Sequence, residues 1–227
     1  MILTLAPGDV LPDLKAVLAA MGGSGSAAGQ GLPGDAAVRA VAQRGLAAAS
    51  TFMQPRVAWV VRPLARVGDE LQVLARSRAE AVLRWRATAA LGRLDGAGKA
   101  GLLVATLGSD LEEEATDAFH RGEYLLGLAL DAIGSIAVHR LANQARRRMG
   151  REAQAEGFVA GHPAGPGYDG WPLGDLPGLV AAAGGPAAGV RLTTGFMLNP
   201  QKSLCLVLPW VGPERGAGHV APDEVAE

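Results

Sequence analysis

The sequence predicts an α+β fold, with a central twisted antiparallel or mixed sheet flanked by helices. Three observations favour this class. Strand-like and helix-like segments alternate without a regular βαβ repeat, the loops between them are short, and the last part holds alternating apolar segments. With 227 residues, 49% of them hydrophobic, the chain is long enough to bury a sizeable core.

The first elements are predicted to be helical. Apolar residues at helical spacing predict a helix over 10–21, with Asp9 as its cap. The glycine- and serine-rich stretch 22–34 predicts a flexible surface loop. A second helix is expected from Asp35 to about Met53.

The middle of the chain predicts a hairpin followed by a buried strand. Residues 56–67 are rich in valine and tryptophan, and Pro63 indicates an edge strand or one that ends early. Residues 70–75 are expected to pair with this strand across a turn at Gly68. We expect a short helix over 84–94 and a buried strand over 99–107.

Two helices are predicted next. The first spans Asp110–His120, where glutamates in the first turn suit the helix dipole. The second spans about 123–148 and is the longest periodic segment of the chain. Its predicted apolar stripe consists of Leu125, Leu128, Ala129, Ala132, Ile133, Ile136 and Leu141.

The last part of the chain predicts a short helix over 173–183 and two strands, 189–198 and 203–210, joined through Asn199 and Pro200. Residues 213–227 are expected to form a disordered tail. We therefore expect one domain over residues 1–212.

Composition narrows the classes of function. A net charge of −1 does not provide the basic field that nucleic-acid binding usually needs. A single cysteine, Cys205, excludes an internal disulfide framework, and the four histidines lack metal-ligand spacing. The first residues do not resemble a signal peptide. Every apolar stretch of 18 residues contains a charged residue or a glycine, so the sequence does not predict a membrane span. We expect a soluble cytoplasmic protein.

Three short motifs do not fit their usual context. The stretch GSGSAA (23–28) matches a dinucleotide-binding pattern but follows a predicted helix instead of a strand. The stretch DGAGKA (95–100) lacks the spacing of a phosphate loop. The stretch DAFHRG (117–122) has one residue too many for the motif that supplies a histidine to cobalamin. None of the three predicts a cofactor site.

Three longer stretches occur together in a familiar order: ATLGSDLEEEATDAFHRGEYLLGLALDAIGS (105–135), PGYDGWP (166–172) and GVRLTTGFMLNPQKSLCLVL (189–208). Together they resemble the activation domain of cobalamin-dependent methionine synthase, and most closely its short free-standing relatives. The earlier stretch PRVAWVVRPL also fits by spacing, so the resemblance covers roughly residues 10–212.

The resemblance implies a C-shaped fold with a central antiparallel sheet. In the family this domain binds S-adenosylmethionine and presents its methyl group to cobalamin held on another domain, while flavodoxin or a similar donor supplies an electron. This chain lacks corrinoid, folate and homocysteine modules. The resemblance therefore implies an accessory protein whose partners are a corrinoid protein or methyltransferase and a flavodoxin- or ferredoxin-type electron donor.

The stretch GHPAGPGYDGWP (161–172) carries the candidate ligand-binding residues, which are His162, Gly167, Tyr168, Asp169 and Trp171. Gly167 and Tyr168 match the family, in which an arginine stands three residues before the proline of P-G-Y. Here that position is Pro163, preceded by His162, and neither side chain forms a bidentate clamp on a carboxylate. S-adenosylmethionine is therefore expected to bind weakly or not at all, and no tightly held cofactor is predicted.

Other interpretations remain open. An acidic contact that the family takes from an early helix corresponds to Asp13 or Asp35, and no motif decides between them. A purely structural role, in which Tyr168 and Trp171 cover the end of the sheet, is as strongly expected as a binding role. The chain is alternatively a binding module with a changed ligand, or a small enzyme that uses His162, Tyr168 and Asp169 for acid–base chemistry.

Shortening the loop 22–34 by several residues should leave the melting temperature within a few degrees, because a glycine- and serine-rich segment without an apolar stripe contributes little to a core. Thermal unfolding followed by circular dichroism measures this. Loss of the cooperative transition would show that the segment is part of the fold.

Overall fold

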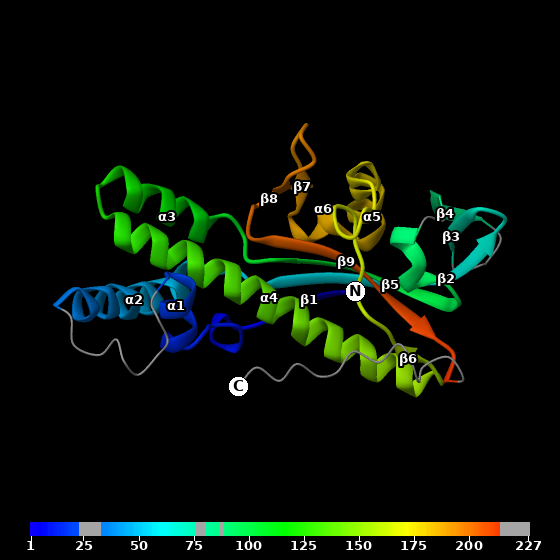
Figure 1. The fold of residues 1–227 in the computed structure, drawn as a ribbon, viewed down its shortest axis with the longest axis horizontal. Coiled ribbons are helices and arrows are strands. Elements are labelled where there is room, and N and C mark those ends of the chain that lie inside the picture. Colours follow the sequence, from blue (N-terminus) through cyan, green and yellow to red (C-terminus); the bar gives the residue numbers. More distant parts are fainter. Residues whose placement is uncertain (23–32, 76–79, 87–88, 214–227) are drawn as a thin grey trace.

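The computed structural model describes residues 1–22, 33–75, 80–86 and 89–213, so most of the expected loop 22–34 and nearly all of the expected tail lie outside the described residues (Figure 1). Its centre is a seven-stranded sheet in the order β4-β3-β2-β5-β9-β6, with β1 paired to β2. All pairings between these described strands are antiparallel, which confirms the predicted fold class. The strands are β1 (Ile2–Thr4), β2 (Arg56–Val67), β3 (Glu70–Leu74), β4 (Ala81–Arg86), β5 (Ala97–Thr106), β6 (Val159–Ala160) and β9 (Ser203–Val211).

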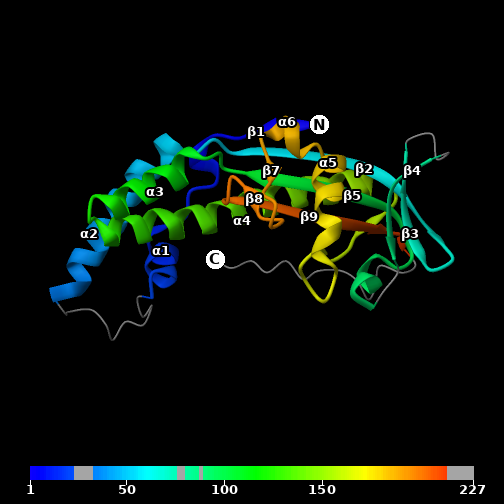
Figure 2. The same cartoon turned by 90° about the horizontal axis from the view of Figure 1, so that it is seen from above.

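The sheet is covered on both faces, which Figures 1 and 2 show from two directions. One face, which we call the α4 face, carries α1 (Leu14–Ala20), α2 (Pro33–Phe52) and α4 (Tyr124–Ala155). The opposite face, which we call the α5 face, carries shorter elements. They are the 3-10 helices η3 (Ala89–Leu94) and η4 (Leu173–Asp175), the helices α5 (Leu176–Ala183) and α6 (Gly185–Ala188), and the hairpin β7 (Arg191–Leu192) with β8 (Leu198–Asn199).

Strand β5 supplies apolar side chains to both layers, because successive residues of a strand point to opposite faces. Leu103 and Ala105 belong to the core on the α4 face, whereas Leu102 and Val104 belong to the core on the α5 face. All four are fully buried. The uninterrupted apolar run of this strand is what a strand covered on both sides requires.

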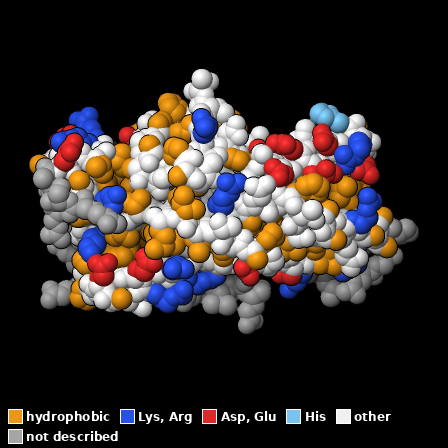
Figure 3. All heavy atoms as spheres, turned by 180° about the vertical axis from the view of Figure 1, so that it is seen from behind, with side chains coloured by type: hydrophobic (Ala, Val, Ile, Leu, Met, Phe, Trp, Pro, Cys, Tyr) orange, Lys and Arg blue, Asp and Glu red, His pale blue; other side chains and the backbone are white. Residues whose placement is uncertain are grey.

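Helix α3 (Asp110–His120) holds the beginning of β9 in place. A carboxylate oxygen of Glu112 accepts hydrogen bonds from the backbone amides of Gln201 (2.7 Å) and Lys202 (3.3 Å). The Lys202 side chain in turn contacts Asp131 of α4 at 2.7 Å. The acidic side chains of α3 gather on one corner of the reverse surface (Figure 3).

The molecule curves around the elements of the α5 face. The β3–β4 hairpin at one end of the sheet and α3 at the other both rise on this side, with α5, α6 and the β7–β8 hairpin between them (Figure 1). This outline agrees with the C shape that the resemblance implies. The hairpin between β2 and β3 was also predicted correctly, and its Gly68 has the positive φ of 62° that the turn requires.

The predicted helix over 10–21 is wrong in its start and its cap. Residues 7–9 form a 3-10 helix, η1 (Pro7–Asp9), and α1 begins only at Leu14. The carboxylate of Asp13, not Asp9, caps α1 by accepting the amide of Ala16 at 2.8 Å. Pro12 explains the shift, because the residue before a proline is disfavoured in helical conformation.

The predicted helix over 84–94 is also wrong. Residues 81–86 form β4, which pairs with β3, and a 3-10 helix follows over Ala89–Leu94. In this register Trp85 lies opposite Leu71 and is buried on the α5 face. The gain from burying an indole against neighbouring strands outweighs the local helical preference of this segment.

The chain between α6 and β9 differs from the two long strands that the sequence predicts. Residues 191–192 and 198–199 are short strands that pair only with each other, and Phe196 at their tip has a φ of 60°. The second predicted strand is correct and pairs with β5 along its length. Strand β2 likewise does not end at Pro63 but changes partner there, from β5 to β3.

Helix α4 runs seven residues beyond its predicted end, and its buried face agrees with the predicted stripe only in part. Ala129, Ile133 and Leu141 of that stripe are buried as predicted. Leu125 and Leu128 of the predicted stripe are exposed, whereas Leu126 and Leu130 are buried. The reason is close packing at small residues. A Cβ built on Gly127 would lie 2.8 Å from the Phe119 ring, so α3 packs directly over the backbone of α4 at a glycine.

Helix α4 is also long and apolar enough to cross a membrane, with a mean hydropathy of 1.5 over 18 residues. In the fold, 56% of that window is buried inside the protein. The helix therefore uses its apolar residues to cover the sheet, as the core helix of a globular domain does.

The buried face of α4 is tested by two leucines two positions apart. Leu130→Ala should destabilise the protein by about 2–5 kcal/mol, because Leu130 is fully buried. Leu128→Ala removes the same atoms from a side chain that is 51% exposed and should cost much less. Urea unfolding of both variants decides, and equal losses would mean that α4 is rotated from the position described.

Candidate functional site

The candidate loop, residues 161–172, begins by pairing with the edge of the sheet. The amide of Gly161 donates to the carbonyl of Pro209 at 2.8 Å, and Ala164 and Val207 exchange two backbone hydrogen bonds at 2.8 and 2.9 Å. Ala160 pairs with Trp210, so four residue steps along the loop span only three steps along β9. The extra residue makes a bulge between these two pairings, in the part that contains His162.

The second part of the loop is closed by its own backbone. Tyr168 donates its amide to Gly165, Trp171 donates to Tyr168, and Gly167 donates to Trp171, at distances of 2.8–3.2 Å. Gly167 and Gly170 have positive φ angles of 91° and 82°, which glycine adopts without strain. These bonds give residues 165–171 a defined conformation.

Trp171 anchors this turn to the core on the α5 face. Its indole is buried and meets the Trp85 ring edge-on, with centroids 5.0 Å apart. The indole nitrogen donates to a carboxylate oxygen of Asp175 at 2.8 Å. The indole nitrogen, the one polar atom of this side chain, therefore has its hydrogen-bond acceptor within the protein. Trp171 is thus a support for the turn.

Tyr168 does the opposite and points outward from the supported turn. Its side chain is 64% exposed, and no hydrogen bond of its hydroxyl is found among the described residues. A tyrosine held on a rigid turn offers a ring face and a hydroxyl to a ligand or partner at little cost in conformational entropy.

Arg93 of η3 joins the two parts of the loop. Its guanidinium donates to the carbonyl of Pro163 at 3.1 Å and contacts the Asp169 carboxylate at 2.9 Å. Asp169 has a φ of 51°, a conformation that is uncommon for a residue with a side chain. Both partners of the pair are about half-exposed, so the pair positions the loop more than it stabilises the fold.

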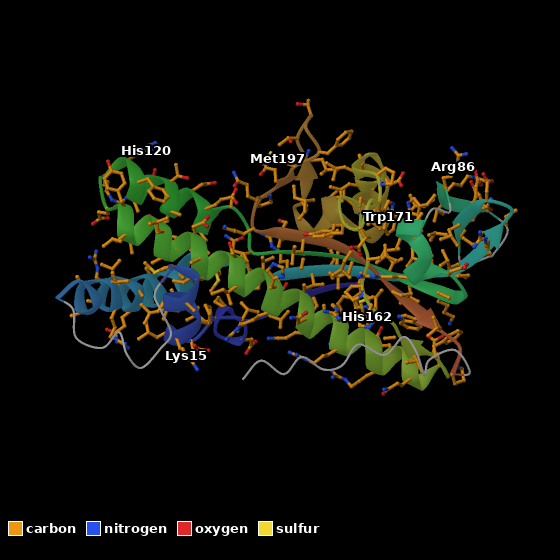
Figure 4. The ribbon with its side chains drawn as sticks, viewed as in Figure 1. Lys15, Arg86, His120, His162, Trp171 and Met197 are labelled. Atoms are coloured by element: carbon orange, nitrogen blue, oxygen red, sulfur yellow. The ribbon has the colours of Figure 1, made fainter. Side chains whose placement is uncertain are left out.

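The five candidate residues therefore do not form one cluster. Gly167, Tyr168 and Asp169 share the turn, and Trp171 lies beneath it. His162 lies on the side of the sheet that faces α4, whereas Trp171 lies on the other side (Figure 4). Among the described residues, no hydrogen bond joins the side chains of His162, Tyr168 and Asp169, the three that an acid–base role would require.

The loop also leaves part of the β9 edge open, a feature that sequence analysis missed. Val207 directs its amide and carbonyl toward the loop, and Cys205, two residues earlier, points its own backbone groups the same way. Within the described residues, no backbone partner is found for the amide of Cys205. An unpaired donor at the edge of a sheet is a place where a ligand can form backbone hydrogen bonds.

Gly165 determines how closely the loop follows this edge. A Cβ at residue 165 would lie 3.2 Å from the carbonyl oxygen of Cys205, so a larger residue would push the loop away. The thiol of Cys205 is not a candidate nucleophile, because burial raises its pKa well above the usual value. The sequence carries no local signal for the open edge, which depends on which segments pair with β9.

The two early acidic candidates are separate from this site or outside the description. Asp13 caps α1 and pairs with Arg140 of α4 at 3.1 Å. The hydrogen bond from the Ala16 amide, with the nearby Arg140, lowers the pKa of Asp13, so its charge serves the helix cap. The side chain of Asp35 lies outside the described residues.

Comparisons with known proteins identify the fold. The sequence matches no protein-family model and no curated protein. Among solved structures, the crystal structure of the MetH reactivation domain bound to AdoHcy matches with a TM-score of 0.72 and 15% sequence identity, and the match covers 92% of this chain and 77% of that chain. The fold that the sequence resemblance implies is thereby confirmed, and this chain has the architecture of the methionine synthase activation domain.

Proposed function

We propose that this chain is a cytoplasmic accessory protein of cobalamin-dependent methyl transfer, acting as one domain over residues 1–212. It docks on a separate corrinoid protein and either reactivates it or positions it for a methyltransferase. The observation that carries this proposal is the match of 92% of the chain to the MetH reactivation domain. An electron donor of the flavodoxin or ferredoxin type completes the proposed reactivation system.

The geometry of the loop supports a docking or binding role over catalysis. Trp171, Asp175 and Arg93 fix the turn from below, while Tyr168 stays exposed above it. A fixed scaffold with one projecting aromatic is typical of a recognition surface. The alternative of a small enzyme has less support, because no hydrogen bond joins the side chains of His162, Tyr168 and Asp169 among the described residues.

The second candidate function is a binding module with a changed ligand, and the composition of the loop favours it. No arginine occurs within residues 161–172, so the loop itself offers no bidentate contact to a carboxylate. The open amide of Cys205 and the exposed ring of Tyr168 remain as general binding features.

The docking role is tested by two tyrosines of nearly equal exposure. Tyr168→Ala should weaken binding to a corrinoid protein by roughly 5- to 30-fold, as the loss of an aromatic hot spot does. The first corrinoid protein to test is one that is encoded beside the gene for this chain. Tyr124→Ala is the matched control, because Tyr124 is 65% exposed on α4, away from the loop, whereas Tyr168 is 64% exposed. Surface plasmon resonance measures both. Equal effects, or no measurable binding by the parent protein, would contradict the docking proposal.

Isothermal titration with S-adenosylmethionine and AdoHcy tests the ligand. We expect binding weaker than micromolar, because a missing charge-assisted bidentate pair costs on the order of 2–3 kcal/mol, or roughly 30- to 150-fold in affinity. Micromolar or tighter binding would show that another part of the chain supplies the contact that the loop lacks.

A further inference from the structure

The last third of α4 carries an arginine cluster, which consists of Arg146, Arg147, Arg148 and Arg151. Arg148 has a carboxylate partner, since it contacts Glu152 at 3.6 Å, and it also lies over the Trp59 ring. Arg147 and Arg151 are exposed and one helical turn apart, as expected for a solvated surface. Arg146 differs from these three because it is partly buried, whereas they are exposed.

The guanidinium of Arg146 is incompletely satisfied. One terminal nitrogen, Nη1, donates to the side-chain oxygen of Asn143 at 2.9 Å. The Nε atom is shielded from solvent, and no acceptor for it is found among the described residues. Burial, and secondarily the charge of Arg147, lower the pKa of Arg146. A shielded charged donor without an acceptor is costly, and such groups often mark the place of an ion or ligand.

The packing of α4 against the edge of the sheet locates this guanidinium. A Cβ built on Gly150 would lie 3.8 Å from the Cβ of Ala160, so this side of α4 faces the start of the candidate loop. Arg146 precedes Gly150 by one helical turn, about 6 Å, and therefore faces the same side. The loop runs antiparallel to β9, and β9 and α4 run in the same direction (Figure 1). From Ala160 to Ala164 the chain advances by three steps of β9, about 10 Å, so His162, halfway along, lies about 5 Å beyond Ala160 and alongside Arg146.

The segments nearest to Arg146 contain no free carboxylate to neutralise it. Residues 132–151 of α4, residues 157–168 (β6 and the first part of the loop) and residues 203–211 of β9 contain neither aspartate nor glutamate. The carboxylates that follow these ranges, Glu152 and Asp169, already contact Arg148 and Arg93. Arg140, the next arginine toward the N-terminus of α4, already pairs with Asp13. Arg146 is therefore a partly buried cation beside its helix, the loop and the sheet edge, and no ion-pair partner for it is found among the described residues.

We propose that Arg146, with Asn143 and His162 beside it, forms a binding site for a small anionic group, a carboxylate or a phosphate, between α4 and the candidate loop. The remaining terminal nitrogen of the guanidinium donates to one oxygen of the anion, and the Nε–H donates to a second once the side chain turns from its shielded position, the fork geometry that arginine favours. Arg146 is partly exposed, so the anion enters from solvent without opening the core. The site stands apart from the docking role, because it uses no contact of Tyr168.

The test is a nuclear magnetic resonance titration of the full chain that follows the arginine Nε–H signals. Sodium phosphate and sodium acetate are each added, with sodium chloride at equal ionic strength as the reference. We expect a saturable shift of the Arg146 signal, identified by its loss in Arg146→Lys, with small and linear shifts for Arg147 and Arg151. Equal, unsaturated shifts at all three arginines would overturn the proposal, whatever the outcome of the corrinoid-binding experiment.

Two variants separate binding from folding. Arg146→Met keeps the apolar stem and removes the donors, and it should weaken phosphate or acetate binding about tenfold or more. Arg147→Met removes a neighbouring exposed charge and should leave binding within about twofold. If Arg146→Met does not fold, the titration of the parent protein alone still decides. Unchanged anion binding in a folded Arg146→Met variant would also overturn the proposal.

Discussion

The double burial of strand β5 is the constraint on which the rest of the structure depends. Its alternate residues form the cores of both faces, so the chain must supply a cover for each. On one face this cover is α4, and Gly101 of β5 permits the approach, because a side chain there would collide with Met149. On the other face the cover is assembled from short helices, a turn and the Trp85–Trp171 pair.

The candidate site follows from the position of β9 in this sheet. Strand β9 pairs with β5 on one side, and within the described part of the chain only β6 and the first part of the loop pair with its other side. The loop leaves the edge at Gly165, and the amide of Cys205 stays open where the loop turns away. The buried indole of Trp171 fixes the turn at the same point, so a rigid loop and an unpaired sheet edge occur side by side.

The same edge separates two chemically different environments. On the α5 side, the negative charge of Asp169 in the loop is neutralised by Arg93 of the same chain. On the α4 side, Arg146 has an amide oxygen as its partner and no carboxylate within the surrounding segments. An apolar strand lies between them, so charge on one side is not compensated by charge on the other. The fold thus offers an aromatic surface and a cationic surface on either side of one strand.

The sequence by itself determined the fold class, most of the elements and the candidate loop. The buried strand β5, the β2–β3 hairpin and the helix α3 carry local signals in their apolar runs, their turn glycine and their first-turn acids. The three ordered stretches also fixed the family likeness. Only the tertiary structure decided that residues 81–86 form a strand, that α4 buries Leu130 instead of Leu128, and that His162 and Trp171 lie on opposite sides of the sheet. The physical reason is that these features depend on contacts between distant segments: Trp85 on its neighbouring strand, Gly127 of α4 on Phe119, and the loop on the edge of β9.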